Sequence, residues 1–397
     1  MGSSRKHSGI CPEPDHEQGG CCIHIVECEM NNRGSTGAYL TWEKLGVAVS
    51  SSSGSADKNG YKSVLTDATG YAKPGEIVAI MGPSGCGKST LLDSLAGMYY
   101  FKAYMTQEQV LTWTLTVKET VYYSAELQLP KSMPKSEKME RADKTIREMG
   151  LQNSMNTRIG GWGIKGLSGG QKRRLSICLE LLTHPKLLLL DEPMSGLDSA
   201  SSYYVMSRIV KLTQQYQMTV VTAIHQPSSQ VFGLFNNLCL LSLGKTLYFG
   251  PTFAANQFFA VNGFPCPELQ SPADHYLMTI NTDFDEDTDI GNIPDEVIHV
   301  LAEAYKSSEV YMETQREIAT LCAKEGELIE GRGGLQASFI TQCMVLSARS
   351  FKNMYRDLGY YWLRLGIYIA LGFALGTLFY EIGFEFDSIS VSFMLKC

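Results

Sequence analysis

Residues 82–89 read Gly-Pro-Ser-Gly-Cys-Gly-Lys-Ser, and this stretch decides the fold. An apolar run at 77–81 precedes it and a helical pattern at 90–96 follows it. Strand, glycine loop and helix, in this order, are the context that a phosphate-binding loop requires. The glycines let backbone N–H groups turn toward phosphate oxygens, and the helix start adds its positive dipole end. The stretch therefore predicts a phosphate-binding loop; the alternative is a Gly-rich turn without a ligand.

Each residue of this loop has an expected contact. Lys88 is expected to reach the β- and γ-phosphates, and the Ser89 hydroxyl is expected to ligate Mg²⁺. The other predicted contacts to the phosphates come from Gly82, Pro83, Ser84, Gly85, Cys86, Gly87 and Thr90.

A second buried strand is expected at 187–190, where four leucines stand in a row before Asp191 and Glu192. A continuous apolar run indicates a parallel strand that is covered on both faces and carries the acids at its carboxyl end. Asp191 is expected to hold Mg²⁺ through water, and Glu192 to position or deprotonate an attacking water. The alternative is an acidic pair that begins a helix.

A third motif, Leu-Ser-Gly-Gly-Gln at 167–171, precedes an apolar stripe at helical spacing. Ser168 is the predicted N-cap of that helix, and Gly169 and Gly170 let a phosphate approach its first N–H groups. The alternative is a capped amphipathic helix without a ligand. A turn ending at Asp198 follows the carboxylates, and His225 ends another predicted strand.

Composition limits the function classes. The 397 residues suffice for two or three domains, and the formal net charge of −7 gives no electrostatic case for nucleic acid, so no nucleic-acid partner is expected. Eleven cysteines without paired spacing indicate a reducing compartment. The first twenty residues are polar and contain no apolar core of a signal peptide.

The sequence predicts an α/β nucleotide-binding domain over 38–290, after a disordered tail over 1–37 that is rich in Gly, Ser, Asn and charge. A first strand is expected at 39–49, and a charged helical subdomain at about 117–149. Two apolar runs around Gly244 predict a β-hairpin with a two-residue turn.

The C-terminal part of the sequence is expected to meet a membrane. Residues 291–358 are predicted to hold a linker and an amphipathic connecting helix, whose basic side chains suit a membrane surface. An uncharged run within 359–384 predicts a membrane-spanning helix, followed by a short tail over 385–397. Basic residues precede the run and acids follow it, so its N-terminal side is expected in the cytosol. The alternative is a buried helix of a soluble protein.

These motifs, in this order, resemble the nucleotide-binding domain of ATP-binding-cassette transporters. The resemblance covers about residues 40–260, and the motif at 167–171 separates this family from other phosphate-loop ATPases. A cassette that precedes the membrane segment is similar to the G subfamily, the white-brown complex half-transporters. Gly-Phe-Pro-Cys-Pro at 263–267 looks like the plant members. The resemblance implies a RecA-like P-loop NTPase fold with a helical subdomain.

The resemblance also implies roles for the quoted residues. Gln107 would sense the γ-phosphate and Mg²⁺, Glu192 would be the catalytic carboxylate, and His225 the switch histidine. The signature residues would contact the ATP that a partner chain holds, and Asp198 would communicate across that dimer. These signature residues are Ser168, Gly169, Gly170 and Gln171.

The cofactors implied by the resemblance are ATP and Mg²⁺, with Ser89, Gln107 and Asp191 at the metal. The implied partners are another half-transporter, in a homo- or heterodimer, membrane lipid and a hydrophobic transported substrate. The resemblance implies an integral membrane protein. Its expected location is the plasma membrane, with the nucleotide-binding domain in the cytosol.

Two features depart from the family pattern. Only 18 residues separate Lys88 from Gln107, fewer than is usual in the family, and the sequence holds one predicted membrane helix where a half-transporter needs several. The sequence therefore looks like an incomplete isoform of an ATP-driven half-transporter. One alternative is a non-transporting fragment that modulates full-length partners. Another is a soluble cassette ATPase that works on nucleic acid or ribosomes, against which the acidic charge and the apolar run argue.

Overall fold

A computed structural model describes most of the chain. The described residues are 22–30, 35–50, 61–97, 102–106, 111–160, 165–281, 293–323, 327–328, 337–357, 361–378 and 380. The strands are β1 (Cys22–Met30), β2 (Ser35–Ser50), β3 (Tyr61–Ala72), β4 (Ile77–Met81), β5 (Lys102–Met105), β6 (Leu187–Asp191), β7 (Thr219–Ala223), β8 (Asn237–Ser242), β9 (Lys245–Pro251) and β10 (Glu327–Leu328).

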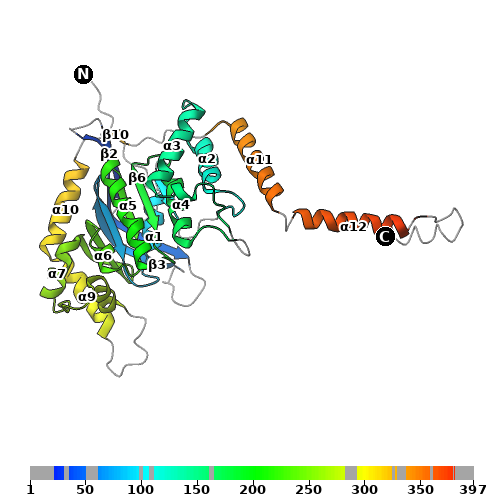
Figure 1. The fold of residues 1–397 in the computed structure, drawn as a ribbon. Coiled ribbons are helices and arrows are strands. Elements are labelled where there is room, and N and C mark those ends of the chain that lie inside the picture. The colour runs from blue at the N-terminus through cyan, green and yellow to red at the C-terminus, as the bar shows by residue number, and fades with distance from the viewer. Residues whose placement is uncertain are drawn as a thin grey trace, which may run out of the picture.

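Helices surround these strands (Figure 1). They are α1 (Lys88–Gly97), α2 (Val117–Gln128), α3 (Lys135–Glu148), α4 (Gly169–Leu181), α5 (Ser199–Tyr216), α6 (Ser229–Phe232), α7 (Ala255–Val261), α8 (Pro272–Ile280), α9 (Ile293–Lys306), α10 (Glu309–Cys322), α11 (Phe339–Arg356) and α12 (Leu363–Leu378), with 3-10 turns η1 (Gln152–Ser154) and η2 (Thr252–Ala254). The strands form one sheet in the order β10-β1-β2-β3-β9-β8-β4-β7-β6-β5.

The parallel core of the sheet consists of β8, β4, β7, β6 and β5. Every residue of β4, β6 and β7 is buried, as expected for parallel strands that are covered on both faces. Ile80 and Asp191 both pair with Ala223, so the carboxyl ends of these three strands reach the same edge of the sheet. The strands predicted before the phosphate loop, before the carboxylates and before His225 are confirmed.

The predicted β-hairpin is also confirmed. Strands β8 and β9 pair antiparallel with Ser242 opposite Lys245, which leaves Leu243 and Gly244 as a two-residue turn. Their φ angles of 46° and 74° are the left-handed pair that a type I′ turn requires. A Cβ at position 244 would lie 2.4 Å from the carbonyl oxygen of Val64, so only glycine fits there.

The N-terminal strands depart in part from the prediction. The strand expected at 39–49 is confirmed within β2. Cys22–Met30, expected in the disordered tail over 1–37, instead forms β1 and pairs along its length with β2. Six of its nine residues are apolar, which the polar composition of 1–37 as a whole conceals. Residues 1–21 lie outside the described part of the chain.

Residues 293–323, predicted within the region 291–358, pack on the sheet. Helices α9 and α10 contact β9, and Tyr305 of α9 is 3% exposed. Its hydroxyl donates to the backbone carbonyl of Phe249 at 3.2 Å. The globular domain therefore extends past the boundary predicted at residue 290, because the apolar faces of these two charged helices complete its core.

Helices α2 and α3 confirm the predicted helical subdomain. A capping box starts α2: Thr116 Oγ1 accepts from the Glu119 N–H at 3.2 Å, and Glu119 Oε2 accepts from the Thr116 N–H at 3.1 Å. Tyr122 of α2 donates to Asp143 of α3 at 2.9 Å. The capping box thus fixes the start of α2, and the Tyr122–Asp143 hydrogen bond joins α2 to α3.

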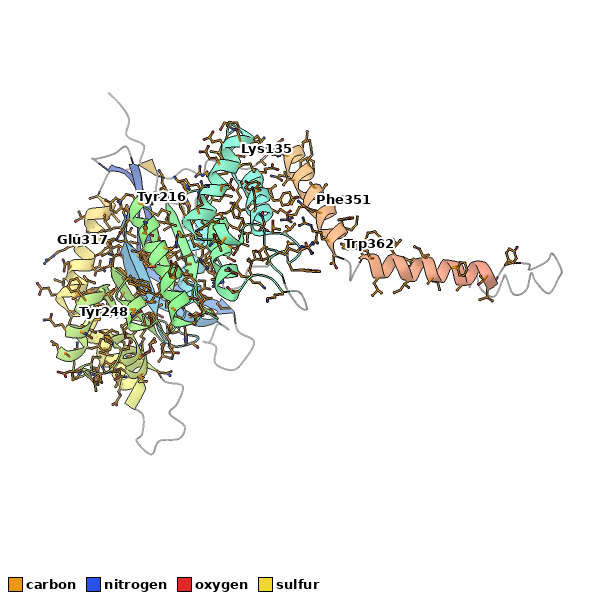
Figure 2. All side chains as sticks on the ribbon, in the orientation of Figure 1. Lys135, Tyr216, Tyr248, Glu317, Phe351 and Trp362 are labelled. Carbon is orange, nitrogen blue, oxygen red and sulfur yellow. The ribbon has the colours of Figure 1, made fainter. Side chains whose placement is uncertain are left out.

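The basic side of α11 faces α2. Arg356 donates to both carboxylate oxygens of Glu119, at 2.6 and 3.0 Å, and Lys352 lies 2.7 Å from the same carboxylate. Two of the cations predicted for a membrane surface therefore pair with the helical subdomain instead. Phe351, on the same helix, is exposed (Figure 2).

Helix α12 extends away from the domain (Figure 1), and its side chains are exposed. It has 16 residues, about 24 Å of helix against a hydrocarbon core of ~30 Å. Among the residues that the structure describes, no helix is long and apolar enough to cross a membrane. Residues 359–360, 379 and 381–384 of the segment predicted to span the membrane lie outside the described residues.

We predict that α11 leaves α2 in acid. Partial burial raises the pKa of Glu119, but the hydrogen bonds from Arg356 and Lys352 outweigh this effect and lower the pKa from 4.5 to about 2. A carboxylate whose folded pKa is lowered stabilises the folded contact above its unfolded pKa, and the contribution is lost as the pH falls toward the folded pKa. A distance probe pair on α2 and α11 should therefore report separation as the pH falls from 4.5 to about 2.

Glu119→Gln separates this effect from general acid unfolding. The amide preserves the capping box but removes the charge, so α11 should be less firmly held at pH 7 and the acid transition should disappear. Glu126→Gln is the matched control, because Glu126 pairs with Lys135 at 2.7 Å inside the helical subdomain. An unchanged acid transition in Glu119→Gln would show that this carboxylate does not hold α11.

Candidate nucleotide-binding site

The predicted phosphate loop joins β4 to α1 at the common edge of the parallel strands. Gly82, Gly85 and Gly87 have φ angles of 156°, 76° and 104°, which other residues rarely adopt. A Cβ at Gly82 would lie 2.0 Å from the Leu241 carbonyl oxygen, and one at Gly87 would lie 2.7 Å from the Leu65 side chain. The loop can therefore curl inward as a phosphate cradle does only with glycine at these positions.

Lys88 is the first residue of α1 and is 7% exposed. Its Nζ donates to the carbonyl oxygens of Gly82 at 2.9 Å and Pro83 at 2.7 Å. A buried ammonium needs such partners, because leaving water is costly for a charge. These bonds hold the amine inside the curve of the loop, where phosphate oxygens could replace the carbonyls. Cys86 Sγ lies 4.0 Å from the amine, and burial raises the pKa of this thiol.

Ser89 and Asp191 meet where a metal ion is predicted. Ser89 Oγ donates to Asp191 Oδ1 at 3.2 Å. Burial raises the pKa of Asp191, and the hydrogen bond from Ser89 offsets part of this effect. A hydroxyl and a buried carboxylate are the hard oxygen ligands that Mg²⁺ prefers, and a cation there would offset the cost of burying the charge. The two residues therefore fit Mg²⁺. Gln107, the third predicted ligand, lies outside the described residues.

Glu192 follows β6 in the left-handed conformation, with φ 46°. Its N–H donates to the Ala223 carbonyl at 3.0 Å, which continues the pairing with β7. Arg173 of α4 donates to the carbonyls of Asp191 at 3.0 Å and Pro193 at 3.2 Å, and also to that of Glu192. Strand pairing and one arginine therefore fix the turn that carries the predicted catalytic carboxylate.

His225 follows β7 and lies beside the phosphate loop. Its Nε2 is 3.4 Å from Ser84 Oγ, and the preceding N–H, of Ile224, donates to the Ile80 carbonyl of β4 at 2.9 Å. A cavity of 390 Å³ lies next to it and is lined by Glu192, His225 and residues of the 194–199 turn. The structure thus brings the histidine, the second carboxylate and the loop to one edge.

The signature motif forms a capping box at the start of α4, as the sequence predicts for Ser168. Ser168 Oγ accepts from the Gln171 N–H at 3.3 Å, and Gln171 Oε1 accepts from the Ser168 N–H at 3.0 Å. This box uses the N–H groups of Ser168 and Gln171, so the first-turn donors that remain for a ligand are those of Gly169 and Gly170.

The Asp198 turn lies beside the signature. Asp198 caps α5, with its two oxygens accepting from the Ser201 N–H at 2.8 Å and the Ser201 hydroxyl at 2.9 Å. These hydrogen bonds lower the pKa of Asp198. A Cβ at Gly170 would lie 3.6 Å from Ser201, and one at Gly169 would lie 3.7 Å from the Gly196 carbonyl. The structure therefore gathers the predicted dimer-facing residues into one exposed region.

Known families match the chain in two places. Residues 65–195, which include the phosphate loop, the signature and Glu192, match the family described as "ABC transporter". The chain belongs to the ABC transporter family. Residues 225–344 match the family described as "ABC-2 type transporter".

This ABC transporter chain is similar to G family members. It is 55% identical over 378 residues to ABC transporter G family member 1 of Petunia hybrida, which is 89% of this chain and 58% of that protein. It is 43% identical over 394 residues to G family member 11 of Arabidopsis thaliana, 90% of this chain and 55% of that protein.

A more distant relative is the mouse protein named "Broad substrate specificity ATP-binding cassette transporter ABCG2". It is 34% identical over 362 residues, 82% of this chain and 55% of that protein. The chain therefore spans less than two thirds of the length of these relatives.

Two contacts at the nucleotide site of this ABC transporter chain were not predicted. The first is the set of hydrogen bonds from Arg173 to three carbonyls around Glu192. The sequence shows a basic run after the signature but does not indicate which groups it contacts. The second is a hydrogen bond from the Tyr104 hydroxyl of β5 to Asp93 Oδ1 of α1, at 2.6 Å. The only signal for it was that Asp93 stands four residues after Ser89, on the same face of the expected helix.

We predict that Lys88→Ala weakens ATP binding by about 10- to 100-fold, because a charged donor to phosphate oxygens is lost. Titration of the purified chain with a fluorescent ATP analogue measures this change. Lys211→Ala, which removes an exposed lysine of α5, is the matched control and should bind as the wild type does. Unchanged affinity in a folded Lys88→Ala protein would contradict the assignment of the loop.

Proposed function

We propose that this chain is the ATP-binding and ATP-hydrolysing part of a G-type half-transporter that works as a dimer. One observation carries the proposal: Lys88, the Ser89–Asp191 pair, Glu192 and His225 all lie at the carboxyl edge of adjacent parallel strands. In open α/β sheets this edge is where ligands bind.

ATP binding rests on the loop residues. The N–H groups at the start of α1 and the Lys88 ammonium would bind the β- and γ-phosphates. Ser89 and Asp191 would hold Mg²⁺, and Gln107 would add a further contact to it. When bound, Mg²⁺ neutralises phosphate charge that develops during phosphoryl transfer.

Glu192 is the proposed general base. Its carboxylate follows directly on the metal-binding Asp191, at a turn that Arg173 and the β7 ladder hold in place. A base must lie within reach of the attacking water and keep its orientation, and a fixed turn serves both requirements. His225, beside Ser84 of the loop, is placed to contact the γ-phosphate from the other side.

The exposed signature supports the proposed dimer. The N–H groups of Gly169 and Gly170 lie at an exposed helix start, so they would bind the phosphates held by a second chain. Asp198 lies next to them and would contact that chain as well. The partner is a second copy or another half-transporter.

The proposed cargo is lipid or another hydrophobic compound, moved across the plasma membrane with the nucleotide-binding domain in the cytosol. Support comes from the match at 225–344 and from the G family relatives. The mouse relative is named for broad substrate specificity.

We predict that Glu192→Gln reduces ATP hydrolysis by about 10²- to 10⁴-fold while ATP remains bound, because the amide cannot accept the proton of the water but keeps the size of the side chain. Phosphate release and retention of radiolabelled ATP are measured in parallel on the full chain in nanodiscs. Retained ATP should be accompanied by a dimer in size-exclusion chromatography.

Glu140→Gln, at an exposed position of α3, is the matched control and should hydrolyse ATP at the wild-type rate. Wild-type turnover by Glu192→Gln would refute the assignment of the base. A chain that binds no ATP under conditions where it is folded would refute the proposed function as a whole.

A further inference from the structure

Strand β5 is a short edge strand that needs an anchor. It has four residues and pairs with β6, its one neighbour in the described sheet. An edge strand has ladder hydrogen bonds on one side alone. Four residues, 98–101, separate it from the end of α1. The position of β5 therefore depends strongly on the contacts between β5 and α1.

The Tyr104 hydroxyl supplies that anchor. Ala103 and Met105 are buried on one face of β5, and Tyr104 points to the opposite face. There its hydroxyl donates to Asp93 Oδ1 of α1 at 2.6 Å. This hydrogen bond ties α1 directly to β5 across the short connection between them.

Asp93 shares a helix face with Ser89. The two residues are four apart on α1, and residues at this spacing are neighbours on a helix surface. Ser89 bonds Asp191 at the end of β6, and Asp93 bonds Tyr104 of β5, which pairs with β6. Two hydrogen bonds from one face of α1 therefore fix it against two adjacent strands.

We propose that Tyr104 is a positioning residue for the metal half of the nucleotide site. Through Asp93 it fixes the rotation of α1, so that the Ser89 hydroxyl stays against Asp191. This inference rests on the proposed function, because it concerns how the same site takes Mg-ATP.

The geometry separates the metal half from the phosphate half. Lys88 is held by Gly82 and Pro83, both within the loop itself. The contact of Ser89 with Asp191 instead crosses from α1 to β6. A small rotation of α1 would therefore break the contact of Ser89 with β6, whereas the Lys88 side chain, although it begins in the same helix, is long enough to keep its bonds to the loop.

The test compares ATP affinity with Mg²⁺ and with EDTA, measured by titration of a fluorescent ATP analogue on the full chain. Tyr104→Phe removes one hydroxyl and should raise the Kd for Mg-ATP about three- to tenfold, the range of one net hydrogen bond. The Kd in EDTA should stay within twofold of the wild type. Asp93→Ala should behave in the same way.

Asp93→Asn distinguishes the hydrogen bond from the charge. The amide oxygen still accepts from the Tyr104 hydroxyl, so this variant should keep the wild-type affinity for Mg-ATP. Tyr122→Phe is the matched control, since it removes a similar bond to Asp143 between α2 and α3. It should leave both affinities unchanged.

Hydrogen exchange gives a readout that is independent of nucleotide. The amides of β5 should exchange faster in Tyr104→Phe than in the wild type and in Tyr122→Phe. Unchanged exchange, an equal loss of affinity with and without Mg²⁺, or a loss in Asp93→Asn equal to that in Asp93→Ala would each overturn the proposal. An ATP affinity that is the same in folded Lys88→Ala as in the wild type would instead refute the proposed function.

Discussion

The shared register of β4, β7 and β6 is the constraint on which the candidate site depends. Ile80 and Asp191 both pair with Ala223, so β4 ends at one level of the sheet with two strands that lie more than a hundred residues after it in the chain. The phosphate loop, the two carboxylates and the histidine each begin within two residues of that level. A slip of one residue would turn every side chain of a strand to the other face, so the buried apolar residues of the strands also keep the polar site in register.

Burial makes the charges of this site depend on their neighbours. Lys88 is satisfied by two carbonyls and Asp191 by one hydroxyl, so each charge lies in a poorly solvated place with neutral partners. Mg-ATP carries both counter-charges, with an anion for the lysine and a cation for the aspartate. Opposite charges that arrive together offset more of the desolvation cost than either could alone.

The features that the sequence predicts well are local ones. Four leucines before Asp191, a two-residue turn at Gly244 and a serine before two glycines each have one favourable backbone conformation, and the structure has all three. The strand over Cys22–Met30 pairs with β2, which follows after four residues, but it lies in a range whose overall composition is that of a tail. The contact of Glu119 with Arg356 depends on a partner far along the chain, which spacing and composition do not identify. The roles of the site residues stay predictions, since they concern ligands, and Gln107 lies outside the described residues.

In the capping box at the signature, the Ser168 hydroxyl can accept one hydrogen bond and donate another. Its oxygen already accepts from the Gln171 N–H, while its proton is available to donate, since a hydroxyl does both at once. A phosphate that drew this proton would polarise the oxygen and strengthen the bond from Gln171, because hydrogen bonds in a chain reinforce each other. The first turn of α4 would then tighten, and it lies beside the turn that caps α5. One serine would thus make the stiffness of a helix end sensitive to the charge of a ligand bound beside it.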